Sequence, residues 1–321
     1  MFLRKTLVAI FGFGLISSLA LVQPARASQD ILIGGGSVTG VYYQVALHVC
    51  NLLNKYNSES YNCVGRPALG SVFNIRAVER GLLDIGVAQS DRNFEAVNGL
   101  GEFSGKPQDN LRSLFSMHPE TILLVARKDS GISNVSELKG KFINIGNPGS
   151  GQRGNAEDVL RLHGLNSDGD IKAEGLQQQE ASRALVDKKI DAFFYTVGNP
   201  AAAIEEPANS TEISIIPLNS DVIQNFVNER SYYVMTTIPA GTYTGVDNDV
   251  ETYAVTATVV TNAGASEDMI YDLVKTIFSN LEELQKAHKA FRVLTPESML
   301  NGLTAPFHPG ALRYYKEQGW K

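Results

Sequence analysis

The sequence predicts an α/β fold with mostly parallel sheets, because segments typical of strands and of helices alternate through much of the chain. Two turns rich in glycine and serine, residues 34–40 and 147–151, support this fold class. Each turn follows a strand-like run and leads into a helix-like segment. Ligands of open parallel sheets collect at the carboxyl ends of strands, so the two turns also predict a binding site.

The first half of the chain contains two strand-helix units and the start of a third. Strands are expected at residues 31–33, 61–64 and 82–88, and helices at residues 41–55 and 71–78. The second helix should end at Gly81. The third strand delivers Gln89, Ser90 and Asp91 to its carboxyl end, which is the edge where a ligand is expected.

The second half begins a new unit after a strand-like run at residues 121–126. A short helical turn is expected at residues 136–141. It is followed by strands at 142–145 and 190–194 and helices at 154–163 and 179–188. The last of these strands leads into residues 195–200, at the matching edge of a second sheet.

The last third of the chain is expected to return to the first domain. A strand at residues 252–260 and helices at 267–280 and 281–289 have no evident partner in the second half. Two chain crossings make a two-strand hinge. The sequence therefore predicts a discontinuous domain 1, residues 28–122 and 235–321, and a domain 2, residues 123–234.

Residues 1–27 have the pattern of an export signal. Arg4 and Lys5 precede an apolar core at residues 7–22, and residues 25–27 form an A-x-A cleavage pattern. A retained membrane anchor is the alternative, but the core is shorter than the roughly 20 residues that a bilayer span needs. We expect cleavage near Ala27 and a periplasmic location.

The net charge restricts the class of partner. It is −6 for the whole chain, and loss of Arg4, Lys5 and Arg26 with the signal lowers it to −9. A nucleic-acid partner is not expected, because phosphate backbones require basic patches. An anion site must rely on local dipoles and on a few placed cations.

Two cysteines, Cys50 and Cys63, are expected to form a disulfide in an exported chain. The bridge would close a loop of about 14 residues and stabilise the fold by roughly 3 kcal/mol in the chain-entropy model. Two buried free thiols are the alternative. The spacing fits no zinc pattern, so no metal site is expected here.

Several enzyme motifs are approached but not completed. Gln152 occupies the place of the phosphate-binding lysine in a P-loop, and Thr39 breaks the dinucleotide fingerprint. Neither serine turn is a G-x-S-x-G elbow. The five histidines are scattered, and none forms a metal-binding pair. We therefore expect neither an enzyme nor a cofactor.

The two turns predict an anion site with two walls. Their small residues allow backbone N–H groups to approach a ligand at the partly positive end of a helix. Tyr42, Tyr43 and residues 193–195 lie beside these turns. Each aromatic group could face the ligand or the core.

Six segments in order resemble the TAXI-type solute receptors of tripartite ATP-independent periplasmic (TRAP) transporters. They are GGGSVTGVYY at 34–43, GSVFNI at 70–75, GLLDIGVAQSD at 81–91, PGSG at 148–151, DAFF at 191–194 and PFHPGA at 306–311. The cysteine pair resembles one branch of the family. Val38 and Gln152 depart from the family pattern at the ligand edge, which leaves the identity of the ligand open.

The resemblance implies a type II periplasmic binding protein, with a ligand cleft between two doubly wound domains. Such a receptor captures a small carboxylate, of the glutamate, glutamine or 2-oxoacid class. It delivers this ligand to separate or fused TRAP membrane subunits that are driven by a cation gradient. The final motif, residues 306–311, is expected to fix the C-terminal tail.

The expected ligand residues come from both domains. Those of domain 1 are Gly36, Ser37, Thr39, Val41, Tyr42, Gln89, Ser90 and Asp91, and those of domain 2 are Ser150, Gly151, Gln152, Arg153, Tyr195 and Gly198. Arg153 is the expected local cation, or else a solvent-facing residue. Asp91 would hold a ligand ammonium or cap the next helix.

Three other functions remain open at this point. A receptor of the same fold could serve an ABC transporter or a sensor kinase. An exported enzyme that acts on a small acid is less favoured, because no activated nucleophile, general-base pair or metal set is visible.

Overall fold

The computed structural model describes residues 28–321, so the expected export signal lies outside the described residues. In the described part of the chain, ten strands form one sheet. Its path runs β2 (Tyr61–Arg66), β1 (Gln29–Gly34), β3 (Ile85–Gln89), β10 (Val250–Asn262), β4 (Leu111–Arg127), β7 (Ala192–Val197), β5 (Phe142–Asn144) and β6 (Lys172–Glu174). Off this path, β8 (Ile213–Ile216) pairs with β4, and β9 (Val234–Ile238) pairs with β10.

The sheet is mixed, so the expectation of mostly parallel pairing is wrong for its centre. Strand β1 is parallel to β2 and β3, and β5 is parallel to β6 and β7. Strand β10 is antiparallel to β3, β4 and β9, and β4 is antiparallel to β7 and β8. The reason is that β4 and β10 run in opposite directions through the middle of the molecule.

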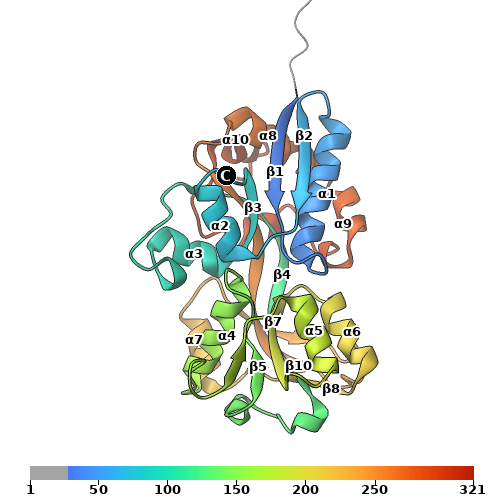
Figure 1. Cartoon of the computed structure of the whole chain (residues 1–321). Helices are drawn as coiled ribbons and strands as arrows, with labels where there is room; N and C mark the ends of the chain where they lie inside the picture. Colours follow the sequence, from blue (N-terminus) through green and yellow to red (C-terminus); the bar gives the residue numbers. More distant parts are fainter. Residues whose placement is uncertain (1–27) are drawn as a thin grey trace, which may run out of the picture.

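Figure 1 shows two lobes connected by β4 and β10. In the first lobe, β1 to β3 are surrounded by α1 (Val41–Tyr56), α2 (Ser71–Glu79), α3 (Ser90–Asn98), α8 (Glu267–Ser279), α9 (Leu281–Ala287) and α10 (Pro309–Glu317). In the second lobe, α4 (Gly151–Leu162), α5 (Gln178–Val186), α6 (Ala202–Ser210) and α7 (Asp221–Asn228) flank β5, β7 and β8. Short 3-10 helices occupy Gly101–Phe103, Lys128–Ser130, Val135–Leu138, Lys289–Phe291 and Ser298–Leu300.

Most predicted elements are confirmed, and the long central strands are the main difference. Strand β4 has 17 residues, whereas only residues 121–126 were expected. Strand β10 serves both lobes, because residues 250–254 pair with β9 and residues 257–261 pair with β3. The domain boundaries at 122/123 and 234/235 stay predictions.

The C-terminal segment returns to the first lobe and is fixed to β4. Phe307 forms a bridge with Ser113, and the Ser113 N–H donates to the Pro306 carbonyl at 2.8 Å. His308 is buried and caps α10, since its Nδ1 accepts from the Gly310 N–H at 3.2 Å. The segment thus fixes the C-terminal tail, as expected from the sequence.

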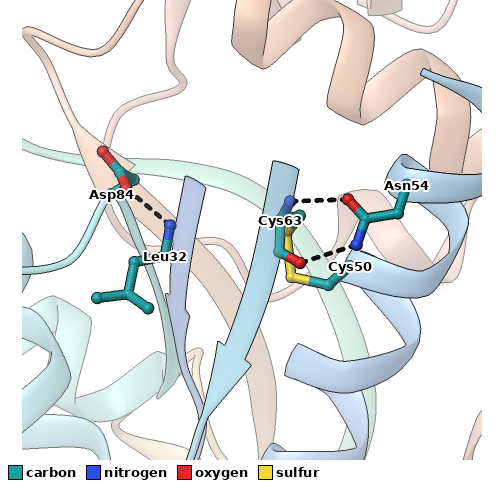
Figure 2. Close-up of a disulfide and its surroundings, with 5 residues drawn as sticks. All are labelled: Leu32, Cys50, Asn54, Cys63 and Asp84. Atoms are coloured by element: carbon teal, nitrogen blue, oxygen red, sulfur yellow. Dashed lines mark hydrogen bonds between the residues drawn. A yellow bond between two sulfur atoms is a disulfide. The ribbon is translucent and has the colours of Figure 1, made fainter. Parts of the chain in front are cut away.

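The predicted disulfide between Cys50 and Cys63 is confirmed, with the two Cα atoms 4.9 Å apart. It links α1 to β2, the strand at one end of the sheet. Figure 2 shows Asn54 on α1 beside it. The Asn54 amide donates to the Cys63 carbonyl at 2.8 Å and accepts from the Cys63 N–H at 2.7 Å. Asn54 therefore satisfies the backbone N–H and C=O of Cys63 on this edge strand.

Within residues 28–321, we find no helix that combines the length and the apolar character needed to cross a membrane.

Candidate ligand cavity between the lobes

A cavity of about 70 Å³ is lined by residues from both lobes. Nine of the residues expected from the sequence line it: Gly36, Ser37, Val41, Tyr42, Gln89, Ser150, Gly151, Gln152 and Tyr195. Nine further lining residues are not among the expected ligand residues, although four of them belong to the predicted turns and strand edge: Gly40, Leu69, Gly70, Ser71, Glu120, Asn147, Gln178, Thr196 and Val197. Both glycine- and serine-rich turns therefore meet at one cavity.

Four helices begin at this cavity. The first residues of α1, α2, α4 and α5 are Val41, Ser71, Gly151 and Gln178, and all four line it. The first N–H groups of a helix have no intrahelical partner, and its N-terminus carries about half a positive charge. None of the lining residues is Lys, Arg or His. The helix ends are therefore the positive elements of the cavity wall.

The two lobes approach closely where α2 and α4 begin. The Phe73 N–H donates to the Gly149 carbonyl at 3.0 Å, and the Asn147 amide donates to the Leu69 carbonyl at 3.0 Å. A Cβ at Gly70, where φ is +108°, would lie 3.1 Å from the Ser150 Cα. Backbone contact of this kind requires glycine in the turn.

Gln89 connects the lobes on another side of the cavity. Its Nε2 donates to Asn155 Oδ1 on α4 at 2.8 Å, and its backbone N–H donates to Ser71 Oγ at 3.1 Å. Thr196 also donates to Asn155 Oδ1, at 2.9 Å. These bonds fix the Gln89 side chain against the first turn of α4.

Gln178 presents an unused donor at the cavity. It is 3 % exposed, and its Oε1 accepts from Gln152 Nε2 at 3.3 Å. Its own Nε2 has no hydrogen-bond partner among the described residues. Buried polar groups are normally paired, so this amide is suited to a ligand oxygen. At the start of α5 the Gln177 N–H donates to Glu180 Oε2 at 3.0 Å, and an acidic residue in the first turn of a helix is the sequence signal available for this site.

Tyr42 and Glu120 form a buried pair in the wall. The Tyr42 hydroxyl donates to Glu120 Oε2 at 2.6 Å, and Glu120 is 2 % exposed. Burial raises the pKa of the Glu120 carboxyl well above its usual value, the hydrogen bond from Tyr42 opposes this rise, and Asp91 adds to it. Burial, followed by the Glu120 charge, also raises the pKa of Tyr42 well above its usual value.

Three expected ligand residues, Thr39, Ser90 and Gly198, do not line the cavity. Thr39 Oγ1 lies 3.3 Å from Ser37 Oγ. Ser90 is fully buried, and its Oγ accepts from the Thr256 N–H at 3.2 Å. A Cβ at Gly198 would lie 2.4 Å from His118 Cδ2, so this glycine makes room for a ring.

Asp91 also lies outside the cavity lining, in the first turn of α3. It does not cap that helix, whose N-cap is Gln89. Its Oδ2 lies 3.0 Å from the Arg92 guanidinium and accepts from Tyr233 at 2.9 Å and from Asn155 at 2.7 Å. The Asp91 carboxylate, which was expected to bind a ligand ammonium or to cap α3, is thus hydrogen-bonded and ion-paired to protein groups.

Arg153, the expected local cation, is not among the residues that line the cavity. It follows Gln152 on α4, and one residue further along a helix points about 100° away. Its Nε donates to Glu157 Oε1 at 3.0 Å, and it lines a separate hollow together with Glu102 and Arg161. Its side chain is partly exposed, and the roles of ligand cation and of solvent-facing residue both stay predictions.

Among the described residues, no group of three His, Cys, Asp or Glu side chains is placed to hold a metal ion.

The model of the NMT1-like family matches residues 33–319. This range includes both lobes and every residue of the cavity wall. The chain belongs to the NMT1-like family. The narrower resemblance to TAXI receptors was inferred from six segments, and it stays a prediction within this assignment.

Solved structures with a similar fold have low sequence identity to this chain. A protein of Bordetella bronchiseptica RB50 is 15 % identical over 91 % of this chain and 98 % of its own, with a TM-score of 0.56. The alkanesulfonate-binding protein SsuA of Xanthomonas axonopodis pv. citri, bound to MOPS, is 16 % identical over 91 % and 85 %, with a TM-score of 0.50.

A third structure, from work on glutathione import through GshT and the cystine ABC importer TcyBC of Streptococcus mutans, is 12 % identical over 82 % and 95 %, with a TM-score of 0.50. At such identities the likeness concerns the fold. The expected α/β fold of periplasmic binding proteins is confirmed, with a mixed sheet and flanking helices.

Proposed function

We propose that this protein is a solute-binding receptor that holds a small carboxylate in the cavity between its lobes. The observation that carries the proposal is the meeting of four helix N-termini at one cavity. The first N–H groups of each helix lack intrahelical partners, and each N-terminus carries a partial positive charge, which together favour an anion. The protein's overall negative charge makes this local field the main source of attraction.

The unpaired Gln178 amide supplies a second, independent reason. Its Nε2 is buried at the cavity and lacks a partner among the described residues. A carboxylate oxygen that accepts from this amide would also face the first turns of α4 and α5. We propose that Gln178, Ser150 and Gly151 hold the carboxylate from the second lobe, while Ser37, Val41 and Tyr42 complete the site from the first.

The receptor is proposed to act outside the cytoplasm, after removal of the export signal predicted for residues 1–27. Its partner would be a membrane transporter. The structures with the same fold include one described together with an ABC importer, which favours that class. A TRAP transporter, implied by the resemblance to TAXI receptors, is the second candidate, and a sensor kinase is the third.

We expect no turnover of the bound solute. The lining residues include no Cys, His, Lys or Arg that could serve as an activated nucleophile or a strong general base. The one ionisable acid in the wall, Glu120, is bonded to Tyr42 rather than to a water-activating partner.

A thermal-shift and calorimetric screen of the purified protein tests the proposal. The panel contains 2-oxoacids, amino acids, dicarboxylates and alkanesulfonates, with neutral sugars as negative controls. A ligand at about 100 times its Kd stabilises the folded state by about 2.7 kcal/mol, which gives a visible rise in Tm. Binding of sugars but not of acids would contradict the proposal.

The variant Gln178→Glu places a carboxylate where the ligand carboxylate is proposed to lie. A helix N-terminus tolerates Glu, so folding should be retained. We expect acid binding to weaken at least about tenfold through like-charge repulsion. Gln179→Glu adds the same charge in the same turn, outside the lining residues, and should leave affinity nearly unchanged. Equal affinity for both variants would refute the proposed carboxylate position.

The transporter class is tested by uptake of a labelled ligand into membrane vesicles that contain the candidate membrane subunits. Uptake that requires ATP and the added receptor identifies an ABC importer. Uptake that requires a cation gradient and no ATP identifies a TRAP transporter.

A further inference from the structure

Glu120 is a buried carboxyl group in the cavity wall that the sequence did not single out. It lies on β4, the strand that runs through both lobes, and it is 2 % exposed. It lines the cavity with the first residues of four helices. A carboxyl group in this place faces any solute that the helix ends attract.

The hydrogen bonding of Glu120 is one-sided. The Tyr42 hydroxyl donates to Oε2 at 2.6 Å, and no hydrogen bond of the described residues reaches Oε1. An ionised carboxylate buried in a protein normally accepts several hydrogen bonds or pairs with a cation. With Oε2 occupied by Tyr42, the carboxyl proton belongs on Oε1.

The charged and titratable groups around Glu120 favour the neutral acid. The negative charge of Asp91 on α3 raises the pKa of Glu120, and the hydrogen bond from Tyr42 on α1 opposes this effect; Tyr195 on β7 is the other titratable group that interacts with Glu120. Asp91 keeps its own partner, Arg92, at 3.0 Å. No cation lines the cavity to stabilise an ionised Glu120. Burial raises the pKa of Glu120 well above its usual value, in agreement with this geometry.

We propose that Glu120 is a specificity-determining residue that remains protonated and donates its Oε1 proton to an oxygen of the bound solute. This inference rests on the proposed receptor function. A carboxylic acid kept neutral by burial is an effective donor to an oxyanion. The protonated Glu120 carboxyl presents a hydrogen-bond donor to the cavity. A solute ammonium group at this position is also a donor, so the two groups could not form a hydrogen bond through the Oε1 proton. The cavity therefore selects acids that carry an oxygen at this position, such as 2-oxoacids, over α-amino acids.

The selection implies a dependence of affinity on pH. Above the pKa of Glu120 in the unliganded protein, binding of an acid requires uptake of one proton. The affinity for an oxoacid should then fall about tenfold for each further pH unit. An amino acid whose ammonium paired with an ionised Glu120 would show the opposite trend, because its binding would release that proton.

Calorimetry with 2-oxoglutarate and L-glutamate tests the proposal, since the two probes differ by an oxo group against an ammonium. We expect wild-type protein to bind 2-oxoglutarate at least about tenfold more tightly. Glu120→Gln keeps a donor in place and should retain the affinity for 2-oxoglutarate to within about threefold, with no pH dependence from about pH 5 to about pH 9. Tighter binding of L-glutamate that is lost in Glu120→Gln would overturn the proposal.

A second measurement needs no ligand. Difference infrared spectra of wild-type protein and Glu120→Gln at neutral pH should show the C=O stretch of one protonated carboxyl group that is present only in the wild type. Absence of this band overturns the proposal, even if the variant folds poorly. Failure of every acid in the panel would instead refute the receptor function. Binding of acids with a preference for L-glutamate would refute the role of Glu120 alone.

Discussion

Gly151 is the single residue whose size most directly decides how close the lobes can come. A Cβ built at this position lies 1.5 Å from Gln89 Oε1 and 2.7 Å from Ser71 Oγ. Gln89 cannot move away cheaply, because its amide is bonded to Asn155 on the same helix as Gly151. The first residue of α4 is therefore glycine for reasons of space.

Gly151→Ala should destabilise the closed arrangement, and we expect a loss of about 1 to 3 kcal/mol in unfolding free energy, as for other overpacked sites. Chemical denaturation measures the loss. Gly169→Ala is the matched control, since a Cβ there has nothing within 4 Å. If both variants were equally stable, the lobes would not be held as close together as described.

The sequence predicted the cavity residues that belong to a local motif, such as a glycine-rich turn before a helix. It did not predict those that reach the cavity only because the fold brings distant segments together. Ser37, Val41, Ser150 and Gly151 line the cavity because glycine- and serine-rich turns start helices. Glu120 had no such pattern. It lies inside a long apolar strand, and its importance depends on Tyr42, which is 78 positions away.

At the scale of elements, the link between α1 and β2 is the most local constraint in the first lobe. The disulfide joins residues 13 positions apart, and Asn54 adds two hydrogen bonds to the same strand. Cys50 and Cys63 are both buried. The covalent link and the amide pair therefore hold β2 against α1.

Replacing both cysteines by alanine should lower the unfolding free energy by about 3 kcal/mol, through the added entropy of the unfolded chain. Urea denaturation measures the difference. Wild-type protein in reducing agent should behave like the variant, whereas the variant should not respond to reducing agent. A variant as stable as the oxidised wild type would contradict this account.

The sequence located most helices and short strands but misjudged the central strands. Alternating helices and strands can be recognised in the sequence when each is bounded by a turn, as for α1 and β2. Strand β4 contains His118 and Pro119 within its 17 residues, and these break the apolar pattern that marks a buried strand. The strand continues because backbone pairing with β10 on both sides of this point holds it.

At the scale of the whole molecule, a buried ionic cluster joins the lobes beside the cavity. Arg92 on α3 pairs with Asp91 at 3.0 Å and with Glu95 at 2.7 Å, and it lies 3.7 Å from Asp158 on α4. A Cβ at Gly154 would lie 2.3 Å from its guanidinium. Separation of the lobes would break the Arg92–Asp158 contact and the hydrogen bond from Asn155 to Asp91, and these contacts favour the closed arrangement.

Glu95 makes the stability of this cluster depend on pH. Burial raises its pKa to about 7 from an ordinary value of 4.5, against the opposing effect of Arg92, while Asp91, Asp158 and Glu102 raise it further. The folded state therefore holds a proton that the unfolded state releases between these two values. The stabilising contribution is complete below about pH 4.5 and is lost as the pH rises to about 7.

The unfolding free energy of wild-type protein, relative to Glu95→Gln, should decrease between pH 4.5 and about 7 and stay level above this range. The slope should be at most about 1.4 kcal/mol per pH unit. Glu137→Gln is the control, because hydrogen bonds from Ser133 lower the pKa of Glu137. Its effect should have the opposite sign and appear only as the pH falls below about 4.5. A flat difference for Glu95→Gln would contradict the assignment.

The sequence predicted a chain that crosses twice between two halves, and the structure has two long strands in that place. The sequence could not predict that the sheet is mixed. The direction of β10 relative to β3 depends on whether the chain passes through the second lobe or the first lobe first along this strand. The Arg92 cluster was equally hidden. Asp91 was expected at the ligand because it follows β3, but the direction of α3 turns it toward α4 instead.

The two strands at the ends of the sheet path, β2 and β6, each carry a protection against the addition of a strand from another chain. At one end, Asn54 occupies the outward N–H and C=O of Cys63. At the other, β6 has three residues, all exposed, and two of them are charged, which are common protections of edge strands. These two strands are therefore poor sites for sheet-to-sheet association between copies of the protein. Under the proposed receptor function, this protection would leave copies of the protein free to diffuse between the solute and a membrane partner.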